Sequence, residues 1–263
     1  MNTTRAYRTV WISDVHLGSR DCKAEYLFEF LTSTQCEYLF LVGDIIDVWA
    51  LKKNVFWPQA HNNVLRAILG KAKHGTRVIY VPGNHDEIFK DHSGNRFGNV
   101  QIEREYIHTT VAGKKLLVIH GDEFDSLVTC SWFESLIGNI GYDLLLASNR
   151  WYHHIRCRFG YPYWSLASFI KRKLKNAMQH VQRYENIVAH ETLRHEADGV
   201  VCGHIHHPHI RQIDGVQYHN DGDWVEHCSA LVESQDGDIS LVYWSDLKNR
   251  QPSSFFSDGH KAA

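Results

Sequence analysis

Five short apolar runs, rich in β-branched and aromatic residues, constrain the fold of this chain more than any other feature. Such runs are typical of strands that are buried on both faces of a sheet. Strands that alternate with helices predict an α/β fold with a parallel sheet. The runs lie at 9–13, 38–42, 77–81, 115–119 and 199–202, and three more strand-like segments follow at 216–220, 228–234 and 239–245. Between the first three runs, apolar residues recur at helical spacing at Tyr26, Leu27, Phe30 and Leu31, and at Val64, Leu65, Ile68, Leu69 and Ala72.

The composition is that of an ordinary folded protein. Its 263 residues are 43% hydrophobic and 22% charged, with a formal net charge of −2, so no molecule-wide attraction for nucleic acid is indicated. The six cysteines show no C-x-x-C spacing, which favours reduced thiols. No signal-peptide pattern opens the sequence, and no run approaches the roughly 18 apolar residues of a membrane span. We expect a cytoplasmic protein, with surface attachment to a membrane left open.

Residue types that ligate metals follow each of the five runs directly. In open α/β sheets ligands bind outside the carboxyl ends of the strands, so these residues can converge in space. A D-x-H or H-x-H pair in extended conformation would also point both side chains to the same side. The residues are Asp14 and His16 after the first run, Asp44 and Asp47 after the second, Asn84, His85 and Asp86 after the third, His120 and Asp122 after the fourth, and His204 and His206 after the fifth.

This set of donors predicts a pair of divalent ions. Carboxylate, imidazole and amide-oxygen ligands suit Mn²⁺, Fe²⁺ or Zn²⁺, and the lack of cysteine among them argues against a purely structural zinc site. Two ions about 3.5 to 4 Å apart that share a carboxylate would use all the donors, which are too many for one ion. Each motif alone is more often a polar loop, so the ordered set of five carries the prediction. We expect the neighbouring His207 and His209 in a polar loop or beside the ligands.

The order of these motifs resembles the calcineurin-like metallophosphoesterase superfamily. Its signature is D-x-H, G-D-x-x-D, G-N-H-[DE], a later histidine, and G-H-x-H, and the match covers residues 9–206. The resemblance implies a β-sandwich flanked by helices, with two metals at the sheet edge. Mn²⁺ is the expected metal, with Fe²⁺, Zn²⁺ and Mg²⁺ as alternatives. The ligands it implies are Asp14, His16, Asp44 and His206 for one ion, and Asp44, Asn84, His120 and His204 for the other.

The same resemblance implies roles for three further residues of these motifs. His85 would protonate the leaving oxygen or stabilise the transition state, and Asp47 would orient it. Asn84 would contact substrate as well as metal. Asp86 is a weaker candidate for orienting His85, and we expect it to be structural.

Within the superfamily the chain is similar to the UDP-2,3-diacylglucosamine diphosphatase family of lipid A biosynthesis. The likeness rests on the chain length, on "ISDVHLGS", "GDIIDVW", "GNHDE", "IHGDEFD" and "VCGHIHHP", and on a helical insertion between the fourth and fifth motifs. It implies hydrolysis of UDP-2,3-diacylglucosamine to 2,3-diacylglucosamine 1-phosphate and UMP at the inner face of the inner membrane. The best-characterised branch of that family carries G-N-R-D where this chain has Gly83-Asn84-His85-Asp86, and Glu in place of Asp47, so this chain is a G-N-H-D relative.

The segment 126–196 differs in composition from the rest of the chain. Eight lysine and arginine residues and no acidic residue lie between Leu144 and Tyr184, among many aromatic side chains. We expect a helical cap inserted into a core formed by 1–125 and 197–263. Its excess of basic and aromatic residues fits a surface that binds an anionic amphiphile or an acidic bilayer, or one that binds a nucleic acid. It also fits a helical hairpin whose basic face is merely solvated. Lys175 is our candidate for contacting a substrate phosphate.

The sequence leaves three functions open. The first is the diphosphatase acting on a nucleotide-linked glycolipid, with peripheral membrane contact through the cap. The second is a phosphodiesterase or nuclease acting on a nucleic acid or another nucleotide. The third is a non-catalytic metallophosphoesterase scaffold, which the complete set of ligand positions disfavours.

Overall fold

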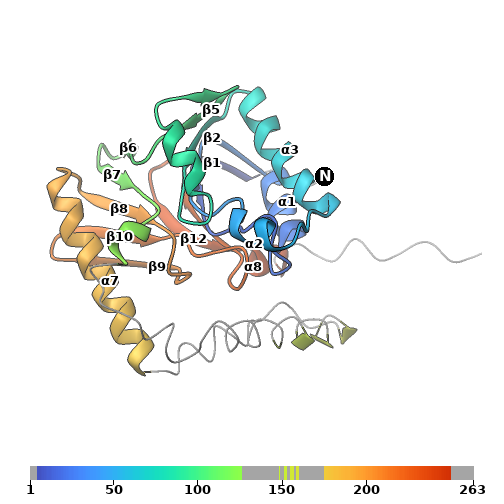
Figure 1. Ribbon diagram of the computed structural model, residues 1–263. Helices are drawn as coiled ribbons and strands as arrows, with labels where there is room; N and C mark the ends of the chain where they lie inside the picture. Colours follow the sequence, from blue (N-terminus) through green and yellow to red (C-terminus); the bar gives the residue numbers. More distant parts are fainter. Residues whose placement is uncertain are drawn as a thin grey trace, which may run out of the picture.

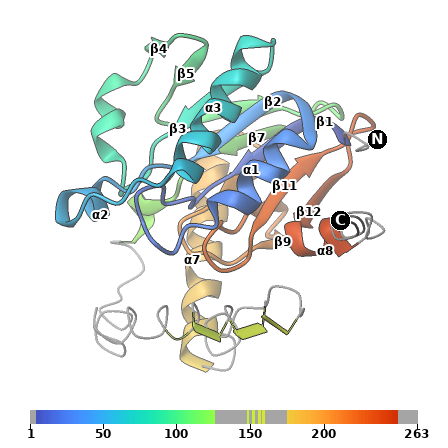
Figure 2. The ribbon, with the colours of Figure 1, turned by 90° about the vertical axis from the view of Figure 1, so that its right-hand side faces the viewer.

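The computed structural model describes residues 5–125, 148, 151–152, 155–156, 158–159 and 175–249, without the side chains of 175–180 and 247–249. The described residues form two sheets that lie face to face, with helices on the outer faces (Figures 1 and 2). This arrangement confirms the mixed α/β sandwich that the sequence predicts. The first sheet has the order β12 (Ile239–Tyr243), β11 (Ser229–Glu233), β1 (Arg5–Ile12), β2 (Thr34–Val42), β3 (Arg77–Val81), β5 (Val100–Ile102), β4 (Arg96–Phe97). The second has the order β6 (Tyr106–Thr109), β7 (Lys115–Val118), β8 (Gly199–Cys202), β10 (Val216–Asn220), β9 (His209–Ile213).

Helices cover both outer faces of the sandwich. Helices α1 (Ala24–Thr32) and α3 (Gln59–Lys73) pack beside each other on the first sheet, and α7 (Lys175–Arg194) packs on β8 and β10 of the second (Figure 1). The shorter elements are α2 (Val48–Lys53), η1 (Glu87–His92), η2 (Asp122–Phe124) and α8 (Trp244–Asn249). Every helix in the described part of the chain is too short or too polar to span a bilayer.

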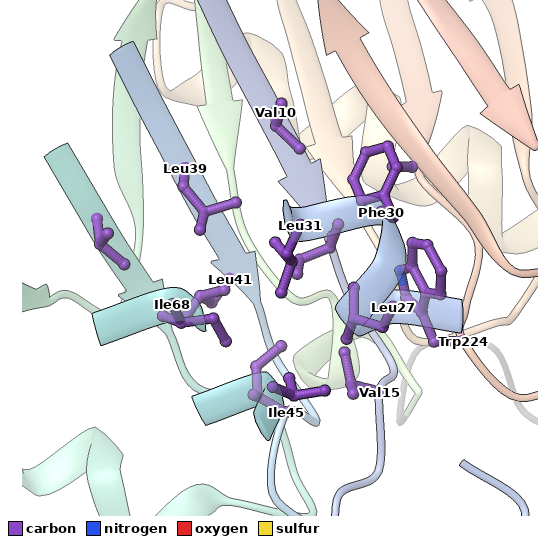
Figure 3. Packing of buried hydrophobic residues seen from close by; sticks show 14 of the residues in the cluster. Val10, Val15, Leu27, Phe30, Leu31, Leu39, Leu41, Ile45, Ile68 and Trp224 are labelled. Carbon is purple, nitrogen blue, oxygen red and sulfur yellow. The ribbon is translucent and has the colours of Figure 1, made fainter. Parts of the chain in front are cut away.

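Side chains of the central strands alternate between two layers of core. On β1, Val10 and Ile12 face the helices, whereas Trp11 faces the second sheet. On β8, Val200 faces α7 and Val201 faces the first sheet. Because successive side chains of a strand point to opposite faces, strands between two apolar layers must be apolar throughout. This explains the continuous apolar runs of the sequence. Figure 3 shows the layer between the first sheet and its helices, with Leu27, Phe30 and Leu31 of α1 over Val10 and Leu39.

The strands β1, β2, β3 and β5 run parallel, as do β7, β8 and β10, which confirms the prediction of parallel sheet. Strands β11 and β12 add an antiparallel edge, and the short strands β4, β5 and β6 were not expected from the sequence. On α3 the apolar spacing was only partly correct, because Val64, Ile68 and Ala72 are buried but Leu69 is 56% exposed. Residues at i, i+4 and i+8 form the buried stripe, and Leu69 lies beside it.

The predicted cap is described only in part. Most of 126–174 lies outside the described residues, whereas α7 falls in its C-terminal third. There Tyr184, Val188 and Ala189 of α7 pack into the core of the second sheet. The division of the chain at residue 196 therefore stays a prediction. Of the six cysteines, Cys22, Cys36, Cys202 and Cys228 are free thiols, and the other two lie outside the described residues.

The buried carboxylate of Glu233 links the two sheets. Thr9 and Arg8 of β1 donate to its Oε2 over 2.7 and 2.9 Å, and the Val111 amide, just after β6, donates to its Oε1 over 2.8 Å. Burial raises the pKa of Glu233, but hydrogen bonds from His108 and these donors outweigh it and lower the pKa to about 2. A carboxyl group with a lowered native pKa stabilises the fold above its ordinary pKa.

We therefore predict that Glu233→Gln lowers the free energy of unfolding at pH 7 by about 1.5 to 3 kcal/mol, the usual contribution of hydrogen bonds to a charged group. In the wild type this contribution is lost as the pH falls from about 4.5 towards 2, so the variant should lose less stability over that range. Urea unfolding at several pH values measures both effects. The matched control is Glu37→Gln on the exposed part of β2, and equal losses in the two variants would contradict the prediction.

Candidate metal centre

Loops from both sheets meet at one edge of the sandwich. Asp14 and His16 follow β1, Asp44 follows β2, His120 follows β7 and His206 lies beyond β8. Parallel strands of one sheet end at the same edge, and the two sheets are stacked so that these edges coincide. The prediction that side chains up to about 190 positions apart would converge is therefore confirmed in geometry.

The first group of ligand-type side chains is Asp14, His16 and His206. Asp14 Oδ1 lies 3.1 Å from His206 Nε2 and 3.9 Å from His16 Nε2. The three ligand atoms lie within 4.8 Å of one another. One carboxylate and two imidazoles at this spacing would supply three ligands to a transition metal ion.

The second group is Asp14, Asp44 and His120, and it shares Asp14 with the first. Asp44 Oδ2 lies 3.5 Å from His120 Nε2, 3.8 Å from His16 Nε2 and 4.0 Å from His85 Nε2. The His120 ring is fixed because its Nδ1 donates to the Val42 carbonyl over 2.9 Å. Asp44 Oδ2 thus faces one histidine of each group, His16 and His120.

The backbone at these residues differs from the expectation. A D-x-H or H-x-H pair in extended conformation was predicted, but Asp14, His16, Asp44, His204 and His206 have φ values between 48° and 68°. The expectation was wrong because the chain turns sharply just after each strand. The turn is held by hydrogen bonds such as His16 N to Asp44 O at 2.8 Å and His204 N to Asp14 Oδ2 at 2.9 Å. Left-handed non-glycine residues cost about 1 to 3 kcal/mol each and concentrate at functional sites.

His204 lies apart from both groups. Its ring is 5.2 Å from the His120 ring, but its Nε2 is 2.8 Å from Asp125 Oδ1. The two imidazoles of the H-x-H pair have different partners, and only His206 reaches Asp14. The expectation that the side chains of the H-x-H pair point to the same side is therefore wrong.

Asp47 connects two histidines of the site. Its Oδ1 accepts from His85 Nδ1 over 3.0 Å, and its Oδ2 accepts from His16 Nδ1 over 3.2 Å. Asp47 also begins α2, where its Oδ1 accepts from the Ala50 amide. The contact with His85 is the one that the sequence suggested, whereas the contact with His16 was missed. Exposed Trp49, on the same helix, lies over the His85 ring at 4.4 Å between centroids.

Asp86 holds two of the loops in place. Its carboxylate accepts from the amides of Gly83 and Ile45 over 2.6 and 2.7 Å and from the Tyr80 hydroxyl. These contacts tie the loop after β3 to the loop after β2, which carries Asp44. They agree with the structural role expected for Asp86 rather than with a role on His85.

The polar atoms left without partners test whether metal ions fit this site. Among the described residues, His16 Nε2, His120 Nε2 and Asn84 Oδ1 are buried and make no hydrogen bond. Buried polar atoms are nearly always paired, so three orphans around Asp44 require a further partner. Nitrogen and oxygen donors facing carboxylates are suited to divalent cations, and the residues present therefore fit a metal centre.

The charges of the site also favour the binding of a cation. Burial would raise the pKa of Asp44, but the neighbouring His120 and His16 lower it, so Asp44 is ionised. Burial disfavours protonation of His16, yet its hydrogen bond to Asp47 and the charge of Asp44 raise the pKa of His16 to about 9. The pKa of His120 is raised as well, chiefly by Asp44 against the effect of burial. The carboxylates thus create a field that favours any added positive charge.

Sequence reasoning missed two supporting residues, Ser13 and Asp221. Ser13 Oγ lies 2.5 Å from Asp14 Oδ2 and 2.6 Å from Asp221 Oδ1. Burial raises the pKa of Asp221 well above its ordinary value, although the hydrogen bond that Ser13 donates to Oδ1 opposes the rise. Asp221 and Asp223 follow β10 directly, so the search for polar residues after apolar strands that found the other loops could have found them too.

The structure places His207 and His209 outside the centre, and the role expected for Lys175 stays a prediction. His207 and His209 contact Glu185 instead of the site. Lys175 is the first residue of α7, and its side chain is outside the described residues.

We predict that Mn²⁺ stabilises this protein and that Asp44→Asn removes most of the effect. At 100 times the dissociation constant, binding adds about 2.7 kcal/mol, which corresponds to a rise in Tm of about 5 to 10 °C. The Asn side chain can still accept from the His85 amide, so the change removes charge rather than shape. Differential scanning calorimetry with and without Mn²⁺ measures the shift. Asp91→Asn, on the exposed end of η1, is the control, and a full shift in Asp44→Asn would contradict the prediction.

Comparison with known proteins identifies the family of this chain. A family model described as calcineurin-like phosphoesterase matches residues 7–208. A UDP-2,3-diacylglucosamine hydrolase of Psychromonas ingrahamii is 23% identical, over 89% of this chain and 96% of that protein. One of a Shewanella species is 26% identical, over 88% of this chain and 94% of that protein. Among solved structures, a phosphoesterase from E. coli is 15% identical with a TM-score of 0.41, over 89% of this chain and 97% of that one. With most of its length matched by the family model, the chain belongs to the calcineurin-like phosphoesterase family and is a metal-dependent hydrolase.

Proposed function

We propose that this protein hydrolyses UDP-2,3-diacylglucosamine to 2,3-diacylglucosamine 1-phosphate and UMP. The observation that carries the proposal is that two groups of ligand-type side chains share Asp14 and that Asp44 Oδ2 faces a histidine of each group, His16 and His120. Such a centre suits attack on a phosphorus atom. The choice of substrate is supported by relatives that bear the name of this hydrolase and align along nearly their whole length.

We assign Asp14, His16, Asp44 and His206 to one divalent ion, and Asp44, Asn84, His120 and His204 to the other. Contacts among the first four support the assignment, as does the unpartnered Asn84 Oδ1 for the second. His204 would join by giving up its contact with Asp125. Two ions bound there would supply a hydroxide near neutral pH and neutralise charge on the phosphoryl oxygens. Mn²⁺ is our proposed metal, in keeping with the mixed nitrogen and oxygen donors.

His85 is our candidate for the group that protonates the leaving oxygen. Asp47 accepts from its Nδ1, so the ring is oriented with Nε2 towards Asp44, and the side chain is 25% exposed. A general acid needs this combination of a fixed ring and access to the substrate. Asn84, the preceding residue, would contact the substrate phosphate with whichever amide atom is not on the metal.

The cap and α7 would accommodate the lipid part of the substrate. We propose that the basic and aromatic residues of 126–196 bind the acyl chains and their anionic head group, with Lys175 on a phosphate. Helix α7 begins at Lys175 beyond the sheet and runs back onto it, which connects this segment to the core (Figure 1). Peripheral contact with a membrane would follow from the same surface.

The substrate is tested by incubating the purified protein with Mn²⁺ and UDP-2,3-diacylglucosamine. We expect release of UMP, measured by chromatography, and loss of the reaction when the metal is chelated. Bis(p-nitrophenyl) phosphate and single-stranded DNA are the comparison substrates. Faster hydrolysis of DNA than of the lipid, with a steep salt dependence, would contradict our proposal and identify the protein as a nuclease. If the protein hydrolyses no phosphoester, the remaining function is that of a non-catalytic scaffold.

His85→Ala should lower kcat for UMP release by about 10²- to 10⁴-fold, the range usual for a lost general acid. Asp47→Asn should lower kcat as well, and it should also weaken Mn²⁺ binding because Asp47 holds His16. Steady-state kinetics at several Mn²⁺ concentrations separate the two effects. His74→Ala, at the exposed end of α3, is the control. If His85→Ala keeps the wild-type kcat, its assigned role is wrong.

A further inference from the structure

A separate group of ligand-type side chains lies next to the loop that carries His206. It consists of Glu185 from the middle of α7, His207 from the loop after β8, and His209 at the start of β9. Their ligand atoms lie within 4.8 Å of one another, with no ion among them. Glu185 Oε1 lies 2.8 Å from His209 Nδ1 and 3.8 Å from His207 Nδ1. The two imidazoles thus face one carboxylate oxygen.

Arg211 fixes the orientation of this carboxylate. Its Nη1 donates to Glu185 Oε2 over 2.8 Å, so the other oxygen, Oε1, is left towards the two histidines. The Glu185 side chain is only 1% exposed, so its position is set by packing as well as by this ion pair. In metal sites, a ligating side chain is regularly oriented by a hydrogen bond from a neighbouring residue to its non-ligating atom.

This group is separate from the centre that contains Asp44. His206 turns towards Asp14, whereas the next residue, His207, turns towards Glu185. None of Glu185, His207 and His209 belongs to the groups around Asp14 and Asp44. An ion between them would therefore bind in addition to the catalytic pair.

We propose that Glu185, His207 and His209 bind a further transition metal ion, with Zn²⁺ as the best match. Two imidazoles and one carboxylate favour ions late in the first-row series over Mn²⁺ or Mg²⁺. The histidine side chains are 24% and 39% exposed, so a water molecule can complete a tetrahedral set. The ion would tie α7, the helix that returns from the insertion, to the loop of His204 and His206. It would act as a structural or regulatory link rather than in the reaction.

The same contacts without an ion would be an ordinary hydrogen-bonded cluster around Glu185, and stoichiometry separates the two cases. Metal-free protein is saturated with Zn²⁺, passed through a desalting column and analysed for bound zinc. We expect His209→Ala and Glu185→Gln each to bind one equivalent less than the wild type. Titration with Co²⁺, followed by visible absorption, should show the same loss. His190→Ala, on the exposed face of the same helix, should bind as much as the wild type.

The double variant Asp44→Asn/His120→Ala makes the test independent of the proposed function. It weakens the main centre, and adding His209→Ala in that background should lower the bound zinc by one further equivalent. Equal zinc content in the wild type and His209→Ala would overturn the inference, whether or not the lipid is a substrate. Circular dichroism confirms folding of each variant, and the exposed His209 makes His209→Ala the one least able to disturb the core.

Discussion

The Asp44 carboxylate is the point on which the rest of the structure depends. It belongs to the first sheet, but one of its imidazole neighbours, His120, belongs to the second and lies 3.5 Å away. The two sheets must therefore keep one relative position to within a fraction of an ångström. Buried side chains between them, including Trp11, Phe40 and Val201, maintain that position. Packing far from the loops is thus part of the geometry of the site.

The sequence was sufficient to predict the strand ends and most of the site. A strand buried on both faces leaves a continuous apolar run, and a polar residue directly after it marks the edge where ligands bind. Asp14, Asp44 and His120 were found in this way. Glycines support the same edge, since a side chain at Gly43 or Gly83 would overlap the His120 ring. This close approach gives a physical reason for the G-D and G-N pairs.

What the sequence could not predict depends on backbone angles and on distant partners. The backbone at His204 and His206 is left-handed instead of extended, and the two side chains that the spacing placed together have different partners. The contacts of Ser13 with Asp221, and of His209 with Glu185, join segments whose proximity no local pattern reports. The short strands β4 and β6 were missed because two to four residues carry too little periodicity to identify a strand.

The connection between β7 and β8 has a consequence for how such proteins diversify. These strands are parallel neighbours, so any chain linking them must cross from one end of the sheet to the other. It necessarily departs from the edge where His120 lies and returns through α7 on the outer face. A crossover of almost any length satisfies this topology. Variation in substrate choice can therefore arise in this connection, which begins beside the candidate site, while the sandwich beneath it is left unchanged.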